Sequence, residues 1–220
     1  MVGLVIAPHH DDEILGVGGT IAKMIASGHE MNVCVVTKGC APLFDENVVE
    51  QVRRESNLAH ERIGIKKTYY LDYPAAMLET VDRYKLNGAI LEAIVETKPD
   101  VVFIPHRGDM QIDHKIVADA CMVALRPKYN HNIKSIYAYE TVSETGWDIP
   151  NVVNEFIPNV YSDITDYIET KVELFSFYES QIGDYPDMRS ERTIRALASY
   201  RGSSVNVEAA EAFMLIRDMI

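Results

Sequence analysis

Short apolar runs alternate with longer segments of helical periodicity through the first two thirds of the chain. Five runs rich in β-branched and aromatic residues predict strands, at residues 3–7, 31–37, 68–73, 101–106 and 135–141. Several are apolar at successive positions, as in strands covered on both faces. The intervening segments predict helices at residues 14–27, 47–63, 80–97 and 114–125. This alternation predicts an α/β fold, a three-layer αβα sandwich with a Rossmann-like, mainly parallel sheet and right-handed crossovers.

The last third of the chain, about residues 148–220, has a different pattern. A loop-rich stretch follows Trp147 and holds one or two expected strands, and helices are predicted around residues 164–181, 190–200 and 207–219. No Gly/Ser linker, low-complexity tract or internal repeat separates this region from the rest. We therefore expect one domain over residues 1–220, whose helical and loop-rich last third packs on the first part.

Composition narrows the class of protein. The 220 residues carry a formal net charge of -12, which disfavours binding to nucleic acid or to anionic membranes. The three cysteines, Cys34, Cys40 and Cys121, show no CxxC spacing and suit a reducing cytoplasm. No apolar run approaches the roughly 20 residues that span a bilayer, and no secretory signal opens the chain. The expectation is a cytoplasmic protein; the sequence is compatible with a homo-oligomer without requiring one.

Charged residues crowd the end of the first predicted strand, where residues 8–13 read PHHDDE. In open α/β sheets, ligands bind outside the carboxyl ends of the strands. Imidazole nitrogen and carboxylate oxygen are the usual ligands of catalytic zinc, so His9 and Asp12 are candidate ligands. Asp11, left unligated beside the metal, would suit a general base. The simpler alternative is a solvated loop whose acids favour the first turn of the following helix.

A second polar segment, HRGDMQIDHK, follows the strand predicted at residues 101–106. His114 is its best candidate for a third ligand, and Asp113 is expected to hydrogen-bond to a neighbouring ligand or to the base. His106 is a weaker candidate, as easily a structural hydrogen-bond donor. The glycines of GVGG at residues 16–19 lack the spacing of a dinucleotide site, and close packing of a helix on the sheet explains them better.

These two segments, APHHDDEILGVGGTIAK and PHRGDMQIDH, resemble the motifs of the PIG-L/LmbE family of metal-dependent N-acetyl deacetylases. The family's usual forms are AHPDDE before a Gly-rich helix start and a second motif ending in HxDH. Variants that accompany surface-polysaccharide and sugar-nucleotide pathways have an HRGDxNxDH form. Further matches cover nearly the whole chain and include ETVSETGW, FIPNVYSDI and MRSERTIRALASYRGSSVNVEAAEAF.

The resemblance implies a divalent metal, zinc first, held by His9, Asp12 and His114, with Asp11 as the general base. Two positions depart from the family pattern. His10 stands where the family has Pro, and Gln111 stands where many members have a His that stabilises the oxyanion or protonates the leaving amine. Gln donates a hydrogen bond to an oxyanion but cannot relay a proton. The identity of the general acid therefore stays open. One solution is that Asp11 acts first as the base and then as the acid.

The resemblance implies hydrolysis of an N-acetyl group on an amino-sugar derivative. The variant form of the second motif favours a sugar nucleotide or a polysaccharide precursor as that derivative. Two alternatives remain: deacetylation of a non-nucleotide metabolite such as a thiol or antibiotic glycoside, and a metal- or nucleotide-binding module without turnover. Candidate substrate-binding residues are Arg53, Arg189 and Arg201, each with a surface or structural alternative. Trp147 is either a sugar platform or a core residue, and Cys40 is expected to be a spectator.

Overall fold

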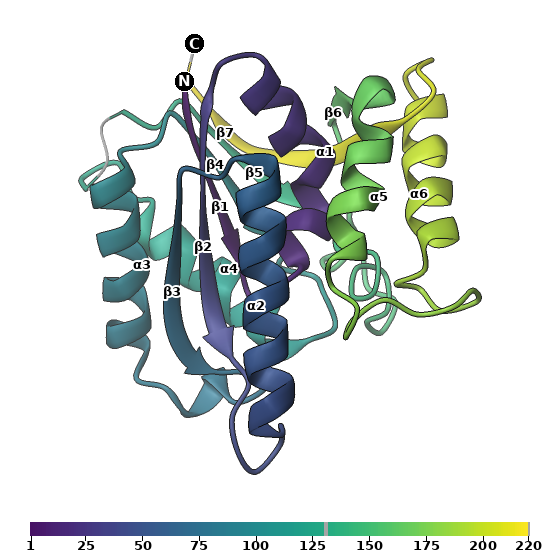
Figure 1. Ribbon diagram of the computed structural model, residues 1–220. Helices are drawn as coiled ribbons and strands as arrows, with labels where there is room; N and C mark the ends of the chain where they lie inside the picture. The colour runs from purple at the N-terminus through teal and green to yellow at the C-terminus, as the bar shows by residue number, and fades with distance from the viewer. Residues whose placement is uncertain (130–131, 220) are drawn as a thin grey trace.

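A computed structural model describes residues 1–129 and 132–219 of the chain. One seven-stranded sheet runs through the molecule, in the order β3-β2-β1-β4-β5-β7-β6. The first five strands along the chain pair in parallel, and β7 pairs antiparallel with both β5 and β6. Helices cover both faces (Figure 1). The predicted α/β sandwich with a mainly parallel sheet is confirmed.

The elements of the first two thirds follow the predicted alternation. Their bounds are β1 Val2–Ala7, α1 Asp12–Ala26, β2 Glu30–Lys38, α2 Glu46–Ile63, β3 Lys67–Pro74, α3 Arg83–Thr97, β4 Val101–Pro105, α4 Ile112–Ala124 and β5 Ser135–Tyr139. A short 3-10 turn, η1, spans Leu78–Thr80. The later elements are β6 Val160–Asp163, the 3-10 turn η2 Thr165–Tyr167, α5 Ile168–Ser176, α6 Glu191–Ser203 and β7 Ala210–Asp218.

The strands bury alternate side chains against two different helical layers. Leu4 and Ile6 of β1 join the core under α3 and α4, whereas Val5 joins the core under α1. Apolar residues on both faces explain why these strands lack an apolar-polar alternation. A further cluster joins α1 to α5 and α6, which stand together on the right of Figure 1.

The glycines of α1 serve close packing. A Cβ on Gly16 would lie 2.2 Å from the Tyr139 ring, and one on Gly19 would lie 2.8 Å from the Ile164 side chain. Tyr139 in turn donates a hydrogen bond to the Ile6 carbonyl of β1, at 3.0 Å. The packing interpretation of GVGG is confirmed by these contacts.

One predicted element is wrong. Residues 207–219 were expected to be a helix, but residues 210–218 form strand β7 in the same sheet as the first part of the chain. Ala, Glu and Met have helical propensity, yet β7 inserts between β5 and β6 and gains backbone hydrogen bonds on both sides. Tertiary pairing overrides a weak local preference. The last third is therefore part of the sheet and not only helical and loop-rich.

The chain order of the strands reverses between β1 and β4. The chain leaves β1 toward β2 on one side, whereas β4 continues toward β5 on the other, so a crevice opens at the carboxyl ends of β1 and β4. Both polar segments begin there: residues 8–13 follow β1, and residues 106–114 follow β4.

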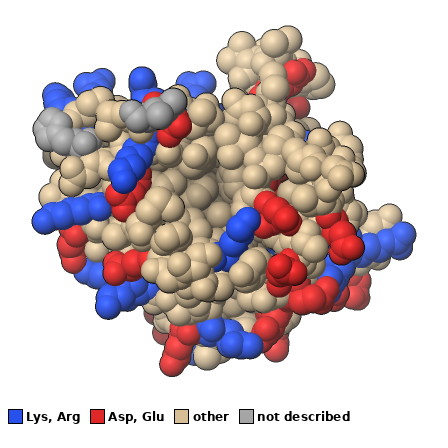
Figure 2. All heavy atoms as spheres, turned by 90° about the horizontal axis from the view of Figure 1, so that it is seen from above, with Lys and Arg blue, Asp and Glu red and all other residues tan. Residues whose placement is uncertain are grey.

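The opposite edge of the sheet carries the chain termini (Figure 1). Figure 2 shows this edge from above, with acidic and basic side chains mixed around a largely uncharged centre. Across residues 1–129 and 132–219, no helix has the length and apolar character needed to cross a membrane.

Candidate active site

Three predicted ligands converge at the crevice. His9, Asp12 and His114 each offer one ligand atom, and these atoms all lie within 4.8 Å of one another. The Asp12 Oδ2 oxygen is 3.2 Å from His9 Nδ1 and 3.3 Å from His114 Nε2. Two imidazole nitrogens and one carboxylate oxygen are the donors that zinc takes in catalytic sites, with a fourth position open.

Among the residues that the structure describes, Asp12 Oδ1 and His114 Nε2 are buried and accept or donate no hydrogen bond. Buried polar atoms are almost always paired, and a cation can serve as the partner of a carboxylate oxygen and an imidazole nitrogen. The donor set therefore fits a divalent cation.

A carboxylate holds the far nitrogen of each histidine. Asp109 Oδ2 lies 2.8 Å from His114 Nδ1, and Asp113 Oδ2 lies 3.1 Å from His9 Nε2. Thr145 donates to the other oxygen of Asp109 at 2.5 Å. Such carboxylate–imidazole pairs fix the ring orientation and make the opposite nitrogen a better metal ligand.

Asp113 is itself anchored to the backbone after β3. Its carboxylate accepts hydrogen bonds from the Ala76 amide at 2.6 Å and from the Leu78 amide at 3.3 Å. Burial raises the pKa of Asp113, but hydrogen bonding to His9 and to these amides outweighs it and lowers the pKa. Asp113 thus stays ionised and holds His9 in place.

Asp11 has an unusual backbone conformation, with φ at 129°. Glu13 Oε2 accepts a hydrogen bond from its amide at 3.2 Å, and its carbonyl accepts from the first amides of α1. Non-glycine residues held at positive φ cost about 1–3 kcal/mol and cluster at functional sites. Asp11 pairs with Arg189, whereas Asp12 pairs with His9 and His114.

Arg189 faces the Asp11 carboxylate. Its Nη1 lies 3.2 Å from Asp11 Oδ2, while the same guanidinium donates to Gln181 at 2.9 Å and to Ser143 at 3.2 Å. Burial raises the pKa of Asp11 to about 7, against the opposing charge of Arg189. A carboxylate with a pKa near 7 beside a cation suits a general base at neutral pH.

His9 and His114, when protonated, balance the negative charge of Asp12. Burial alone lowers the pKa of His9, but hydrogen bonds to Asp113 and Asp12 outweigh it and raise that pKa to about 9. Burial also lowers the pKa of His114, but Asp12 and Asp109 outweigh it and raise that pKa to about 10. Burial raises the pKa of Asp12, but the two histidines outweigh it and hold that pKa well below its usual value.

Glu13 stabilises the loop at residues 8–13 through buried hydrogen bonds. It is fully buried, and its Oε1 lies 3.0 Å from His60 Nε2 and accepts from the Tyr178 hydroxyl at 2.6 Å. Neither His60 nor Tyr178 was selected from the sequence, because they come from α2 and from the turn after α5. Asp109 and Thr145 were also missed as a pair; the spacing of Asp109 five residues before His114 was the available signal.

The structure brings Gln111 to the site as the N-cap of α4. Its Oε1 accepts from the Asp113 amide at 2.5 Å, and its Nε2 lies 3.4 Å from His9 Nε2. His10 stacks on Tyr70, with ring centroids 5.5 Å apart, and its buried Nε2 has no hydrogen-bond partner among residues 1–129 and 132–219.

The other predicted residues lie around the site. Arg53 pairs with Asp72 and covers the Tyr70 ring, 3.7 Å from its centroid. Arg201 donates to both oxygens of Glu140, at 2.8 and 2.6 Å, and so ties α6 to the end of β5. Of the three arginines, Arg189 is the one that pairs with Asp11 within the described residues.

The structure also places His106, Trp147 and Cys40. His106 Nε2 lies 3.0 Å from the Asn154 carbonyl oxygen, in a structural contact. Trp147 is 69% exposed, so the core alternative is wrong. Cys40 is half-buried and lines a groove.

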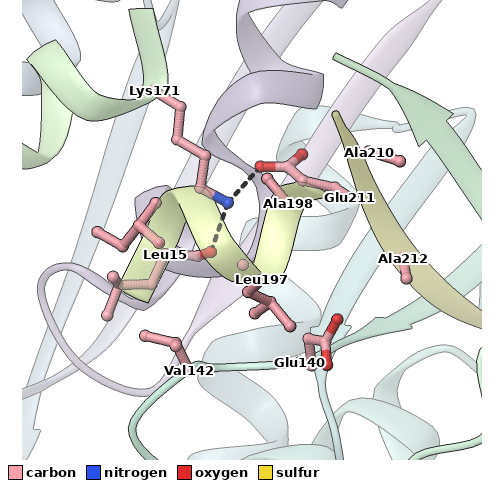
Figure 3. Close-up of a pocket in the computed structure, with 11 residues that line it drawn as sticks. Leu15, Glu140, Val142, Lys171, Leu197, Ala198, Ala210, Glu211 and Ala212 are labelled. Carbon is pink, nitrogen blue, oxygen red and sulfur yellow. Dashed lines mark hydrogen bonds and ion pairs between the residues drawn. The ribbon is translucent and has the colours of Figure 1, made fainter. Parts of the chain in front are cut away.

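Two open grooves flank the polar cluster. One, of about 430 Å³, is lined by the 38–44 turn, α2 and the end of β3. The other, of about 420 Å³, is lined by the segment after β5, by Met188 beside Arg189, and by α6. A third, small cavity of about 20 Å³ lies away from the cluster, where Lys171 bridges α1 and β7 (Figure 3).

The fold and this cluster define a class: an α/β protein with a candidate His-Asp-His metal site at the topological switch point of its sheet. The family model of PIG-L, GlcNAc-PI de-N-acetylase, matches residues 4–125, which contain both polar segments. The chain belongs to the PIG-L family of deacetylases.

Relatives agree with this assignment. The diacetylchitobiose deacetylase of Thermococcus kodakarensis is 26% identical over 97% of this chain and 82% of its own length. The structure of the N,N'-diacetylchitobiose deacetylase of Pyrococcus horikoshii superposes with a TM-score of 0.80 at 24% identity, covering 98% of this chain and 83% of that one.

The same fold also supports other chemistry. The 4-carboxy-2-hydroxymuconate hydratase GalB of Pseudomonas putida superposes with a TM-score of 0.75 at 18% identity, over 100% of this chain and 97% of that one. The fold alone therefore does not select the reaction, and function has to be argued from the residues of the site.

Proposed function

We propose that this chain is a zinc-dependent N-deacetylase that hydrolyses the acetamide of an amino-sugar derivative to acetate and a free amine. One observation carries the proposal. The donor atoms of His9, Asp12 and His114 converge within 4.8 Å, and the buried Asp11 lies between His9 and Asp12 in a strained turn. Relatives named for sugar deacetylation support the choice of substrate class.

The roles of the residues follow from their contacts. A divalent ion bound by the two histidines and Asp12 supplies Lewis acidity, which polarises the acetyl carbonyl and acidifies a water molecule. Asp11 accepts the proton of the attacking water, and Arg189 holds its carboxylate and favours the ionised form. Asp109 and Asp113 fix the two imidazole rings.

The substrate is a sugar nucleotide or a polysaccharide precursor in this proposal, because the second motif, HRGDMQIDH, resembles the HRGDxNxDH form found with those pathways. The three cysteines are free, and two of them are buried, which suits a cytoplasmic enzyme. A non-nucleotide glycoside or thiol conjugate is the alternative substrate, and a binding module without turnover is the alternative function.

Acetate release tests the proposal. Zinc-loaded protein is incubated with diacetylchitobiose, a simple N-acetylglucosamine glycoside and UDP-N-acetylglucosamine, before and after chelation. We expect acetate from at least one substrate, loss of the signal on chelation and recovery when zinc is restored. Protein that binds zinc but releases acetate from none of the three would favour the binding module.

A further inference from the structure

Amide hydrolysis needs a proton donor for the departing nitrogen, and the groups already described leave this step unassigned. Gln111 carries no titratable proton, and its oxygen caps α4. Asp109 and Asp113 each hold an imidazole. His10 is buried against Tyr70.

A short turn after β5 lies against the residues of the site at three points. Ser143 accepts a hydrogen bond from Arg189, which faces the base. Thr145 donates to Asp109, which holds His114. Between them, the Glu144 carbonyl accepts from the Met110 amide, at 3.3 Å, next to Gln111. The backbone of Glu144 is thus fixed beside the position where many family members carry a histidine.

The carboxyl group of Glu144 is free to act. Within residues 1–129 and 132–219, no hydrogen bond or ion pair engages it, and the residue is half-buried. The turn that carries it contacts Arg189 and Asp109, so the residue lies beside the proposed base and the proposed ligands. The charges of His114, Asp12, Arg189 and His9 act on its carboxyl group.

We propose that Glu144 is the general acid that protonates the leaving amine. This inference rests on the proposed deacetylation. Water adds to the acetyl carbon and gives its proton to Asp11. The carbon–nitrogen bond then breaks as the Glu144 carboxylic acid transfers its proton to nitrogen. Acetic acid, which ionises to acetate, and the amine leave; Asp11 then releases its proton to solvent and Glu144 regains one.

The charge state of Glu144 is compatible with this role. Burial raises its pKa above the ordinary value, with a smaller contribution from Asp12, while His114 and Arg189 oppose the rise. A carboxyl group with a raised pKa retains a proton in a larger fraction of molecules at neutral pH. The division of labour between Asp11 and Glu144 also removes the need for one carboxylate to act twice.

Leaving groups of different basicity test the inference. The wild type, Glu144→Gln and the exposed control Glu155→Gln are loaded with zinc, and bound zinc is measured in each. Each is assayed on the best N-acetyl sugar and on 4-nitrophenyl acetate, whose leaving group departs without a proton. We expect Glu144→Gln to lose about 10²–10⁴-fold in kcat/KM on the amide. The same variant should change less than threefold on the ester, and Glu155→Gln should match the wild type.

A second variant tests the inference if the wild type does not hydrolyse 4-nitrophenyl acetate. In Glu144→Ala, added formate should restore amide hydrolysis in proportion to its concentration, whereas Asp11→Asn should gain nothing. Loss of zinc, equal losses on amide and ester, or full amide activity in Glu144→Gln would each overturn the assignment. So would a Glu144→Ala protein that formate does not rescue. If the wild type itself releases no acetate from any amide, it is the proposed deacetylation that fails.

Discussion

Asp109 Oδ2 lies 2.8 Å from His114 Nδ1, in a fully buried pair. The carboxylate accepts from the Nδ1 proton, and Nε2 faces Asp12 at 3.3 Å. When the ring gives up one proton to bind a cation, Asp109 therefore keeps the remaining proton on Nδ1 and leaves Nε2 as the donor atom.

Asp109→Asn should weaken metal binding without unfolding the protein. The amide can present a donor to Nδ1 and disfavour the required tautomer, so we expect zinc affinity to fall about 10–100-fold. Competition with a chromophoric chelator measures the affinity. Asp119→Asn, which removes a carboxylate that pairs with Arg107 at the surface, is the matched control and should bind zinc normally.

Asp11→Asn should separate metal binding from turnover. Asp11 is not among the three converging donors, so zinc content should remain that of the wild type. Loss of a general base lowers kcat by about 10²–10⁴-fold. Metal analysis and acetate release on the same sample test both statements, and an active Asp11→Asn protein would remove Asp11 from the mechanism.

Metal uptake should release protons. The pKa values of about 9 for His9 and about 10 for His114 mean that both rings are protonated at pH 7 before metal binds. Zinc binding then displaces about two protons, and each unit of acidification weakens it by about a hundredfold. Calorimetry in buffers of different ionisation heat counts the protons; a count near zero would contradict the charge assignment.

With a chelator present, His10 should lower the stability of the protein at acid pH. Burial, with the charge of Arg53, lowers the pKa of His10 from 6.5 to about 4. Between these values the unfolded chain binds the extra proton, so stability is full above pH 6.5 and is lost as pH falls toward 4. The loss attributable to this group is at most about 3 kcal/mol.

Thermal denaturation with a chelator present tests this. Between pH 7 and pH 4.5, His10→Gln should lose less stability than the wild type, whereas His29→Gln, at the opposite edge of the sheet, should follow the wild type. Parallel loss in all three proteins would show that His10 is not the responsible group.

Lys171 should be important for stability. Its Nζ donates to Glu211 at 2.6 Å and to the Leu15 carbonyl at 2.7 Å, in the buried arrangement of Figure 3. Lys171→Met leaves the Glu211 charge buried without its cation, so we expect a loss of about 3–5 kcal/mol in the free energy of unfolding. Urea denaturation measures it. Arg62→Met, which breaks an exposed pair with Glu173, should cost far less.

The order of elements was readable from local pattern because strands buried on both faces are continuous apolar runs. β1 and β4 are of this kind, and the polar segments that follow them identified the edge that holds the site. β7 was misread as a helix, because its side chains carry helical propensity and its pairing with β5 and β6 is not a local property.

The sequence by itself determined the parallel strands of the sheet, the edge that holds the candidate site and the three residues offered as donors, because these depend on local pattern and on residue type. Only the tertiary structure decided which groups are neighbours across long stretches of chain. Arg189 pairs with Asp11, and Tyr178 donates a hydrogen bond to Glu13. The Glu144 carbonyl accepts a hydrogen bond from the Met110 amide. These contacts depend on how the last third packs against α1 and α4, and a pattern confined to one segment carries no information on that packing.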